Sequence, residues 1–317
     1  SVPLIMEKIY RSKVRPTFEK SALLRTLYGW SPTRKLLHKV AGKKLKALFG
    51  GRMRFFAIGG AKFDSEAERF LKEAGFPYGI GYGLTETAPL LAGAVGKMVR
   101  IGSTGPALQG VELRLDNVNP ATGQGEIVAK TPCCMSGYYK NEEATKDAFT
   151  ADGWFRTGDL GYIAKDGWVF IKGRLKNMIV GPSGENIYPE DIEEVLNSNP
   201  VVAESVVTEE NGKLVALVHF DTAALEARYE ELKKLLAESK DQLGQKYSES
   251  KEQLEKKMDE VKRELLTYVN NKVNRFSQIT KVIDNGCEFE KTPTKKIRRF
   301  VYEQRAKNGF IPDSNLA

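Results

Sequence analysis

The segment from 54 to 86 constrains the fold most, because a strand, a glycine turn, a helix and a second strand follow one another within it. An aromatic and apolar run at 54–58 is typical of a strand and ends in two glycines. Asp64 can then cap a helix, and a second strand is expected at 76–80. This alternation indicates an α/β fold, in which ligands bind beyond the carboxyl ends of the strands. The run GYGLTE, at 81–86, follows the second strand directly.

The regions before and after this segment differ in composition and indicate two domains. Residues 1–50 are expected to form basic helices, and residues 102–172 are expected to form short strands with glycine turns in a β-barrel-like section. Further on, a hairpin is expected to turn at Asn211-Gly212. We therefore expect part of a large α/β domain at 1–175 and a small α+β domain at 176–317.

Residues 222–274 are the most unusual part of the small domain, because they are dense in lysine and glutamate yet keep apolar residues at helical spacing. The pattern predicts long amphipathic helices, with Gly244 as a turn between two arms. One interpretation is a solvated helical insertion whose apolar stripe packs on its own domain. The alternative is a coiled-coil or partner-binding arm that self-associates or contacts a membrane surface.

The composition is that of an ordinary globular protein, with 41% hydrophobic and 28% charged residues. No apolar stretch approaches the roughly 18 to 20 residues of a membrane span, and no signal-peptide pattern is present, so we expect a cytoplasmic protein, with peripheral membrane contact as an alternative. Three cysteines cannot form a disulfide framework. The net charge of +8 favours polyanionic partners, and without zinc-finger spacing or an RNP-like run we expect a phosphate-rich small ligand rather than nucleic acid.

The run GYGLTE contains the residue types that a nucleotide monophosphate requires. Its glycines, Gly83 among them, let the backbone approach a flat ring closely, and the ring of Tyr82 can stack on a base. Thr85 can donate to a phosphate oxygen, and Glu86 can hold Mg²⁺ through its carboxylate. Taken alone, the run is also consistent with a glycine-rich turn capped by threonine.

Three further segments can complete such a site. Asp159, in GWFRTGDLG, is an acidic residue of the kind that binds ribose hydroxyls, and Arg174 can contact ribose or phosphate. The lysines of EKTPTKKIRR, at 290–299, lie on a proline-containing loop that can aim a cation at developing phosphate charge. Each segment alone is also consistent with a turn or a solvated basic tail.

The order of these motifs resembles that of the AMP-forming acyl-activating ligases, the superfamily of acyl-CoA synthetases, luciferases and adenylation domains. The corresponding segments, in chain order, are IGGAKF, GYGLTE, GEIVAKTPCCMSGYY, RTGDLG, GRLK, SGENIYPEDIE and TPTKK. The resemblance runs nearly end to end. The segment GRLKNMIVGPSGENIYPEDIE and the TPTKK ending resemble the bacterial long-chain fatty-acyl branch in particular.

The resemblance implies a role for each matching residue. Gly59, Gly60 and Ala61 would line the adenine and acyl pocket, and Tyr82 would lie against the adenine. Thr85 would contact the phosphate and Glu86 would bind Mg²⁺. Asp159 and Arg174 would bind the ribose. The remaining roles would be the domain hinge at Lys176, the pantetheine tunnel of coenzyme A at Gly184, and adenylate formation at Lys296. Lys295 stands where most relatives have glycine, which departs from the family pattern.

One family motif, the glycine- and serine-rich phosphate loop, is not found in these 317 residues. The resemblance therefore implies that the chain is the carboxyl-terminal part of a longer ligase and has little ligase activity by itself. The implied substrates are a fatty acid, ATP and coenzyme A. The alternatives are a ligase for an aryl or other carboxylic acid, and a non-catalytic binding module with a vestigial nucleotide site.

Overall fold

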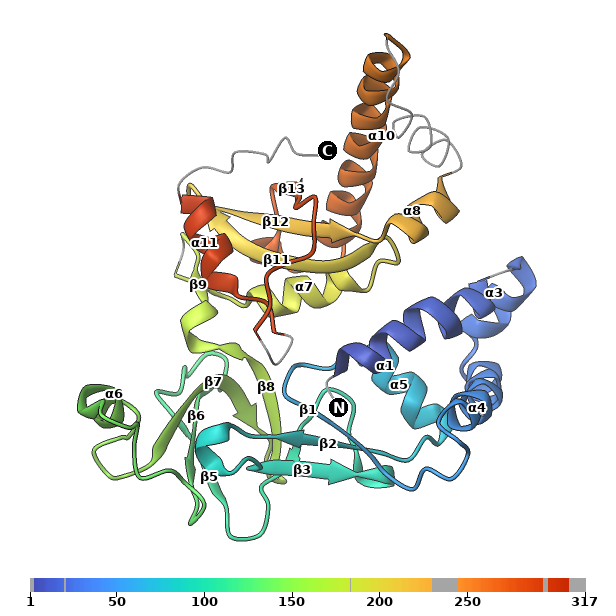
Figure 1. Ribbon diagram of the computed structural model, residues 1–317. Helices are drawn as coiled ribbons and strands as arrows, with labels where there is room; N and C mark the ends of the chain where they lie inside the picture. The colour runs from blue at the N-terminus through green and yellow to red at the C-terminus, as the bar shows by residue number, and fades with distance from the viewer. Residues whose placement is uncertain (1–2, 20, 183, 230–244, 293–295, 308–317) are drawn as a thin grey trace. The chain divides into compact units, whose positions relative to one another are not determined.

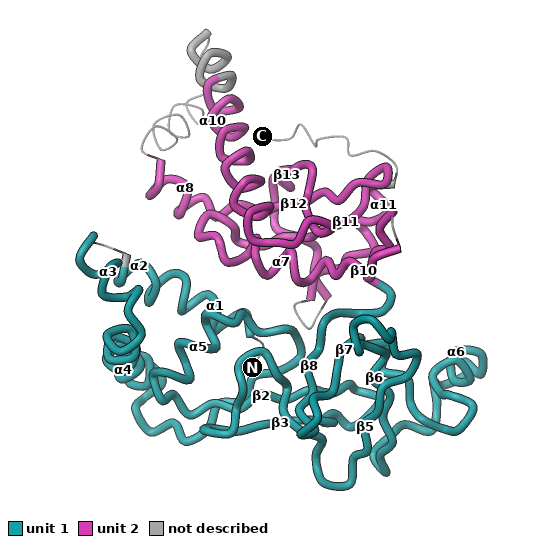
Figure 2. Tube along the Cα trace, turned by 180° about the vertical axis from the view of Figure 1, so that it is seen from behind, with its two compact units in different colours: residues 1–176 teal, residues 177–317 magenta. Residues whose placement is uncertain are grey.

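The computed structural model describes residues 3–19, 21–182, 184–229, 245–292 and 296–307. These residues form two compact units, Ser1–Lys176 and Asn177–Ala317 (Figure 2). Their division lies one residue after the position at which the sequence suggests a domain boundary. No helix in the described ranges is long and apolar enough to cross a membrane.

The first unit begins with a series of helices (Figure 1). Their bounds are Pro3–Ile9 (α1), a π-helical turn at Tyr10–Val14 (η1), Arg15–Glu19 (α2), Ala22–Gly29 (α3) and Ser31–Leu48 (α4). The side chain of Ser21 caps α3 by accepting a hydrogen bond from the amide of Leu24. Pro32 lies in the first turn of α4, where a missing amide hydrogen costs nothing.

A small mixed sheet follows, in the order β1-β2-β3. Its strands are Phe56–Gly59 (β1), Tyr78–Tyr82 (β2) and Ala92–Val95 (β3), with the helix Ser65–Ala74 (α5) between the first two. The first two strands pair in parallel, which confirms the α/β class. The Asp64 cap is also confirmed, because its carboxylate accepts from the amide of Ala67 at 2.7 Å. A core around Ile58, Phe70 and Tyr78 joins α5 to the sheet.

The expected β-barrel-like section is an open antiparallel sheet in the order β4-β8-β7-β6-β5. Its strands are Gly105–Pro106 (β4), Glu112–Asp116 (β5), Gly125–Lys130 (β6), Phe155–Ile163 (β7) and Trp168–Arg174 (β8). The edge strands β4 and β5 do not pair with each other in the described part of the chain, so the barrel is not closed. Short helices lie at Thr85–Thr87 (η2), Gly96–Met98 (η3), Glu142–Asp147 (α6) and Leu175–Asn177 (η4).

The second unit is built on a three-stranded sheet in the order β11-β12-β13. Its strands are Val202–Glu210 (β11), Lys213–Phe220 (β12) and Lys281–Asp284 (β13), and a two-stranded hairpin pairs Ile179–Val180 (β9) with Asn186–Ile187 (β10). Its helices are Pro189–Asn197 (α7), Thr222–Arg228 (α8), Gln245–Asn270 (α10), Arg275–Ser277 (η5) and Arg299–Lys307 (α11). The turn expected at Asn211-Gly212 is confirmed, and both residues have positive φ as a tight hairpin requires.

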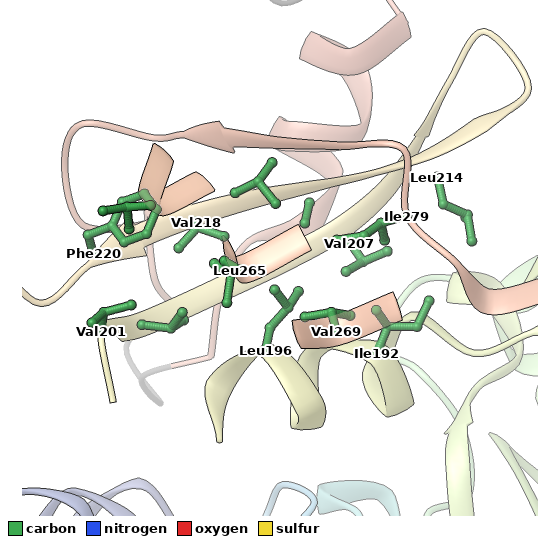
Figure 3. Packing of buried hydrophobic residues seen from close by; sticks show 14 of the residues in the cluster. Ile192, Leu196, Val201, Val207, Leu214, Val218, Phe220, Leu265, Val269 and Ile279 are labelled. Atoms are coloured by element: carbon green, nitrogen blue, oxygen red, sulfur yellow. The ribbon is translucent and has the colours of Figure 1, made fainter. Parts of the chain in front are cut away.

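The long helix α10 packs on its own domain. Leu265 and Val269 of this helix lie in one cluster with Ile192 and Leu196 of α7, beneath strands β11 and β12 (Figure 3). The other face of the sheet packs against a second cluster that includes Tyr302 of α11. These contacts favour the first interpretation of 222–274, a helical insertion with a locally packed stripe. The predicted turn at Gly244 lies outside the described residues.

Candidate nucleotide site

The carboxyl end of β2 is shaped by glycines whose backbones lie unusually close to their neighbours. Gly59 and Gly81 are paired across the parallel strands, and a Cβ on Gly59 would lie 2.7 Å from the carbonyl oxygen of Gly81. A Cβ on Gly83 would lie 1.7 Å from the carbonyl oxygen of Pro89. Gly60 has a φ of +89°, which side chains rarely tolerate. These glycines are therefore required by the backbone path itself.

Three of the predicted site residues meet directly. The hydroxyl of Tyr82 donates to Oδ2 of Asp159 at 2.8 Å, and Nε of Arg174 lies 2.9 Å from Oδ1 of the same carboxylate. Asp159 and Arg174 are paired across strands β7 and β8, so the antiparallel register sets their contact. Burial, with the Asp159 charge adding to it, raises the pKa of Tyr82 well above its usual value. Tyr82 is therefore a neutral hydrogen-bond donor at physiological pH.

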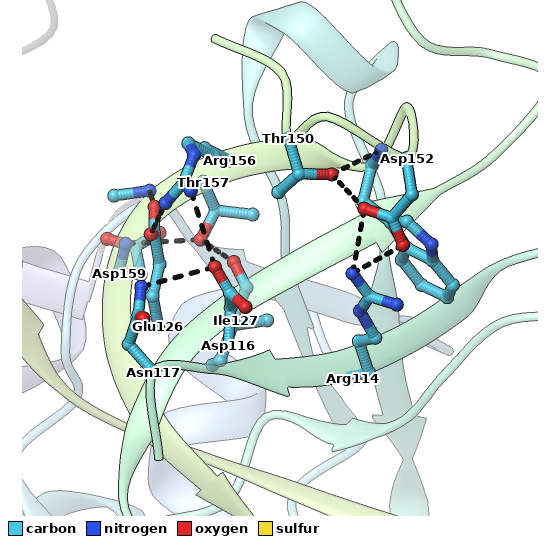
Figure 4. Close-up of polar contacts among 12 residues, drawn as sticks. Arg114, Asp116, Asn117, Glu126, Ile127, Thr150, Asp152, Arg156, Thr157 and Asp159 are labelled. Atoms are coloured by element: carbon cyan, nitrogen blue, oxygen red, sulfur yellow. Dashed lines mark hydrogen bonds and ion pairs between the residues drawn. The ribbon is translucent and has the colours of Figure 1, made fainter. Parts of the chain in front are cut away.

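Two residues without a predicted role hold the turn that presents Asp159 (Figure 4). The buried hydroxyl of Thr157 donates to the carbonyl of Ile127 at 2.6 Å and accepts from the amide of Asp159 at 3.1 Å. The buried carboxylate of Glu126 accepts from the Gly158 amide at 3.2 Å. Glu126 lies in the GEIVAK segment and Thr157 in the RTGDLG segment. These two motifs were the sequence signal that could have identified them as site residues.

Glu126 also forms an ion pair within the same sheet. Its Oε2 lies 2.6 Å from a guanidinium nitrogen of Arg156, and Asp116 lies 3.4 Å from the other. Gly158, between Arg156 and Asp159, has a φ of +67°. The ion pair and the amide contact thus fix a left-handed turn immediately before the carboxylate of Asp159.

Glu86 is held by Tyr138, a residue for which the sequence predicted no role. Its Oε1 accepts from the hydroxyl of Tyr138 at 3.0 Å, and its carbonyl accepts from the amide of Met135 at 2.7 Å. Thr85 is exposed at the start of η2, and the hydroxyl of Thr87 contacts both the amide and the carbonyl of Leu84. The TE pair of GYGLTE is therefore presented on a turn with defined hydrogen bonds, beside Tyr138.

The other predicted residues lie at or beyond the end of the first unit. Lys176 is exposed in η4. Gly184 is exposed in the turn between β9 and β10 with a φ of +81°, and its amide donates to the carbonyl of Gly181 at 2.9 Å. Lys296 is exposed, and its carbonyl accepts from the Thr292 amide at 2.8 Å. Gly184 and Lys296 belong to the second unit, whereas the Tyr82, Asp159 and Arg174 cluster belongs to the first.

Comparison with known proteins identifies related sequences. The sequence profile described as "AMP-binding enzyme" matches residues 1–139. The long-chain-fatty-acid–CoA ligase FadD15 of Mycobacterium bovis is 31% identical over 246 residues, which are 71% of this chain and 40% of that protein. The chain belongs to the AMP-binding enzyme family. Its curated relatives also include the 2-succinylbenzoate–CoA ligase of Bacillus cytotoxicus, 38% identical over 160 residues, which are 49% of this chain and 33% of that protein.

Solved structures of similar fold belong to adenylate-forming ligases. ATP-bound MatB from Rhodopseudomonas palustris aligns with a TM-score of 0.62 and 25% identity, over 86% of this chain and 50% of MatB. The o-succinylbenzoate CoA synthetase MenE of Bacillus subtilis, in complex with an acyl-adenylate, aligns with a TM-score of 0.60 and 24% identity, over 83% of this chain and 49% of MenE. This AMP-binding enzyme chain thus spans about half or less of the length of the relatives it matches.

The site of this AMP-binding enzyme has the donors and acceptors that a nucleotide and Mg²⁺ need. A carboxylate beside a guanidinium, as in Asp159 and Arg174, suits the vicinal hydroxyls of ribose. Among the described residues no group of three or more His, Cys, Asp or Glu side chains could enclose a metal ion. Mg²⁺ is commonly bound by one or two carboxylates together with substrate phosphates, so Glu86 alone fits that role.

Proposed function

We propose that this chain carries the nucleotide site of an ATP-dependent ligase that joins a long-chain fatty acid to coenzyme A. The observation that carries the proposal is the contact of Tyr82, Asp159 and Arg174 at the carboxyl end of a strand in an α/β sheet. The similarity to FadD15 extends over 246 residues, whereas the similarity to 2-succinylbenzoate–CoA ligase extends over 160. This difference favours a fatty acid over an aryl acid as the substrate.

The proposed reaction has two steps. A carboxylate oxygen attacks the α-phosphorus of ATP, the bond to pyrophosphate breaks, and an acyl-adenylate forms. The thiolate sulfur of coenzyme A then attacks the acyl carbon, and AMP leaves with the electrons of the broken carbon–oxygen bond. Dividing the reaction in this way replaces one difficult displacement with two easier ones.

The first step uses the residues of the first unit together with Lys296. Asp159 and Arg174 hold the ribose, while Tyr82 and the backbone at 59–61 hold the adenine. Thr85 donates to the α-phosphate. Glu86 would hold Mg²⁺, which would supply positive charge against the phosphates. Lys296 stabilises the charge that develops on the α-phosphate.

The second step uses residues near and beyond the unit boundary. Residues at a domain boundary can absorb large changes of backbone angle, and Lys176 lies at the last position of the first unit. We propose that rotation about Lys176 removes Lys296 from the acyl-adenylate and brings the Gly184 turn to it. Gly184 has no side chain and a positive φ, so it leaves room for the pantetheine arm of coenzyme A.

Calorimetric titration with AMP tests the nucleotide site. Asp159→Asn is expected to weaken AMP binding at least tenfold, because it removes the charge that ribose hydroxyls and Arg174 both face. The matched control is Asp116→Asn, which neutralises a partly exposed carboxylate of the same sheet and should leave AMP affinity unchanged. Equal losses in both variants, or no AMP binding by the wild type, would favour a non-catalytic binding module instead.

The product of the whole gene is used to test the division of labour between the two steps. Lys296→Ala should abolish adenylate formation, measured by pyrophosphate exchange, and spare thioester formation from supplied acyl-adenylate. Lys281→Ala, a change at another exposed lysine of the second unit, is the control and should affect neither step. A panel of fatty and aryl acids then identifies the substrate, and turnover restricted to aryl acids would exclude the fatty acid.

A further inference from the structure

The positive charge of this chain is concentrated at its amino-terminal end. Residues 1–50 contain twelve lysines and arginines and two glutamates, a net charge of +10, whereas the whole chain carries +8. The remaining residues therefore carry a net charge of −2. The lysine-rich helix α10 contains six basic and six acidic residues and is neutral. Attraction for polyanions thus belongs to the first helices rather than to the insertion.

Helix α4 exposes a second apolar stripe in addition to its buried one. His38, Gly42 and Leu45 are buried. Leu36 and Val40, one turn apart, are 64% and 53% exposed. With 3.6 residues per turn, these two lie on the side of the helix opposite Leu45. The packing of α4 on the first unit therefore leaves this second stripe in solvent.

Helix α3 and its carboxyl-terminal cap show the same pattern. Leu23, Leu27 and Trp30 have the spacing i, i+4, i+7, and all three are exposed, Trp30 by 65%. The helix is nevertheless fixed to the unit, because the hydroxyl of Tyr28 lies 3.0 Å from Nε2 of the buried His38. In this chain these apolar side chains are thus exposed on a helix that is itself packed.

Lysines flank the exposed stripe of α4. Lys35, Lys39, Lys43, Lys44 and Lys46 are all exposed, and no acidic side chain in the described ranges forms an ion pair with any of them. By the same helical geometry, Lys39 and Lys46 lie on one side of the stripe and Lys44 on the other. Their charge is therefore available to an outside partner.

We propose that helices α3 and α4 bind the surface of an anionic lipid membrane. Apolar side chains can enter the boundary between headgroups and acyl chains, while flexible lysines on both sides reach the lipid phosphates. Nucleic acid would use the lysines but leave the aliphatic stripe in water. A second copy of the chain would bring two surfaces of strong positive charge together. An anionic lipid surface matches both properties, and this inference stands whichever acid the enzyme activates.

Binding is measured with vesicles of phosphatidylcholine alone and with vesicles that also contain phosphatidylglycerol. The protein should cosediment with the anionic vesicles, and the emission of Trp30 should shift to shorter wavelength as its ring leaves water. Trp30→Phe should remove the shift while keeping the binding. Failure to bind anionic vesicles, or equal binding to both kinds, would overturn the proposal.

Variants separate the contributions of charge and apolar stripe. One lysine near an anionic surface contributes about fivefold to binding, so changing Lys39, Lys43 and Lys46 to Gln should weaken it about a hundredfold. The matched control changes three exposed lysines outside α4 to Gln, namely Lys130, Lys165 and Lys213. This control should weaken vesicle binding far less. Equal losses in the two sets would show that only net charge matters and would contradict the proposal.

A further variant distinguishes the membrane from other partners. Changing Leu36 and Val40 to Ser should weaken vesicle binding about tenfold or more. The midpoint of unfolding in urea should not change, because both side chains are exposed. Vesicle binding that is insensitive to this change, or a dimer in solution that it abolishes, would overturn the proposal. The product of the whole gene must also bind anionic vesicles in the same assays. Failure of the whole protein to bind would mean that other residues cover the stripe, and it would overturn the proposal.

Discussion

Replacing Thr157 by Val tests whether the turn before Asp159 is held by a single hydroxyl. The substitution keeps the side-chain shape but removes the two hydrogen bonds, of 2.6 and 3.1 Å, that the hydroxyl makes with Ile127 and Asp159. Both backbone groups are then left without this partner in a buried environment. Losing the bonds and leaving these groups unsatisfied should cost about 2–4 kcal/mol.

Thr157→Ser is the matched control, because it keeps the hydroxyl and removes one methyl group. Its expected cost is about 1 kcal/mol. The difference between the two variants, about 1–3 kcal/mol, isolates the hydrogen bonds. AMP affinity should fall in the Val variant and remain near that of the wild type in the Ser variant, because only the former releases the Asp159 backbone.

Urea unfolding followed by tryptophan emission suits this measurement, because all three tryptophans, Trp30, Trp154 and Trp168, belong to the first unit. With a slope of about 2–3 kcal/mol per molar urea, the Val variant should lower the midpoint by about 1 M. If the Val variant is no less stable than the Ser variant, the hydroxyl does not hold the turn, and the account of how Asp159 is presented fails.

Three further predictions concern other positions. Glu126→Ala removes the buried carboxylate that pairs with Arg156 and should destabilise the first unit by about 1–3 kcal/mol in the same assay. Asp116→Ala removes the more distant carboxylate of the same arginine and should cost less than about 1 kcal/mol. Equal effects would contradict the importance of the Glu126 ion pair. Gly83→Ala should disrupt the first unit, because the new Cβ would lie 1.7 Å from a carbonyl oxygen. Gly29→Ala is the control: it lies in a helix, no atom lies within 4 Å of the new Cβ, and it should stabilise the unit by about 0.5–1 kcal/mol. A stable Gly83→Ala variant would refute the close approach at Gly83. Burial raises the pKa of Glu193 from 4.5 to about 7, although the guanidinium of Arg299 in contact with it opposes the shift, so between these pH values the folded second unit binds this proton while the unfolded chain loses it. Its stability should therefore fall by up to about 3 kcal/mol between pH 4.5 and 7, and circular dichroism should show a smaller fall for Glu193→Gln.

The local features of the fold were predictable because they depend on residues near one another in sequence. The Asp64 cap and the Asn211-Gly212 turn are examples, and both were predicted correctly. The two first strands begin two residues later than expected. Pro77 explains the second shift, since it has no amide hydrogen for strand pairing, and its carbonyl instead accepts from the amide of Phe56, where the first strand now begins.

The contacts that hold the site were less predictable because they depend on strand register and loop path. Tyr138 meets Glu86 across 52 positions, and Glu126 meets Gly158 across 32. Motif order could indicate that these segments matter, but not which side chain bonds to which. Likewise, the sequence of residues 1–50 predicted basic helices, while only the packed structure shows that Leu36 and Val40 lie on the outer side.

Helix α10 has a consequence for protein engineering. The sequence presents it as an addition to the small domain, yet Val261, Leu265 and Val269 are buried in the main hydrophobic cluster of that domain. Removing the helix to obtain a minimal lid, or exchanging the lid at a junction within it, would uncover the face of the sheet that contains Val207 and Val218. Grafts between relatives should therefore transfer α10 together with the strands that it covers.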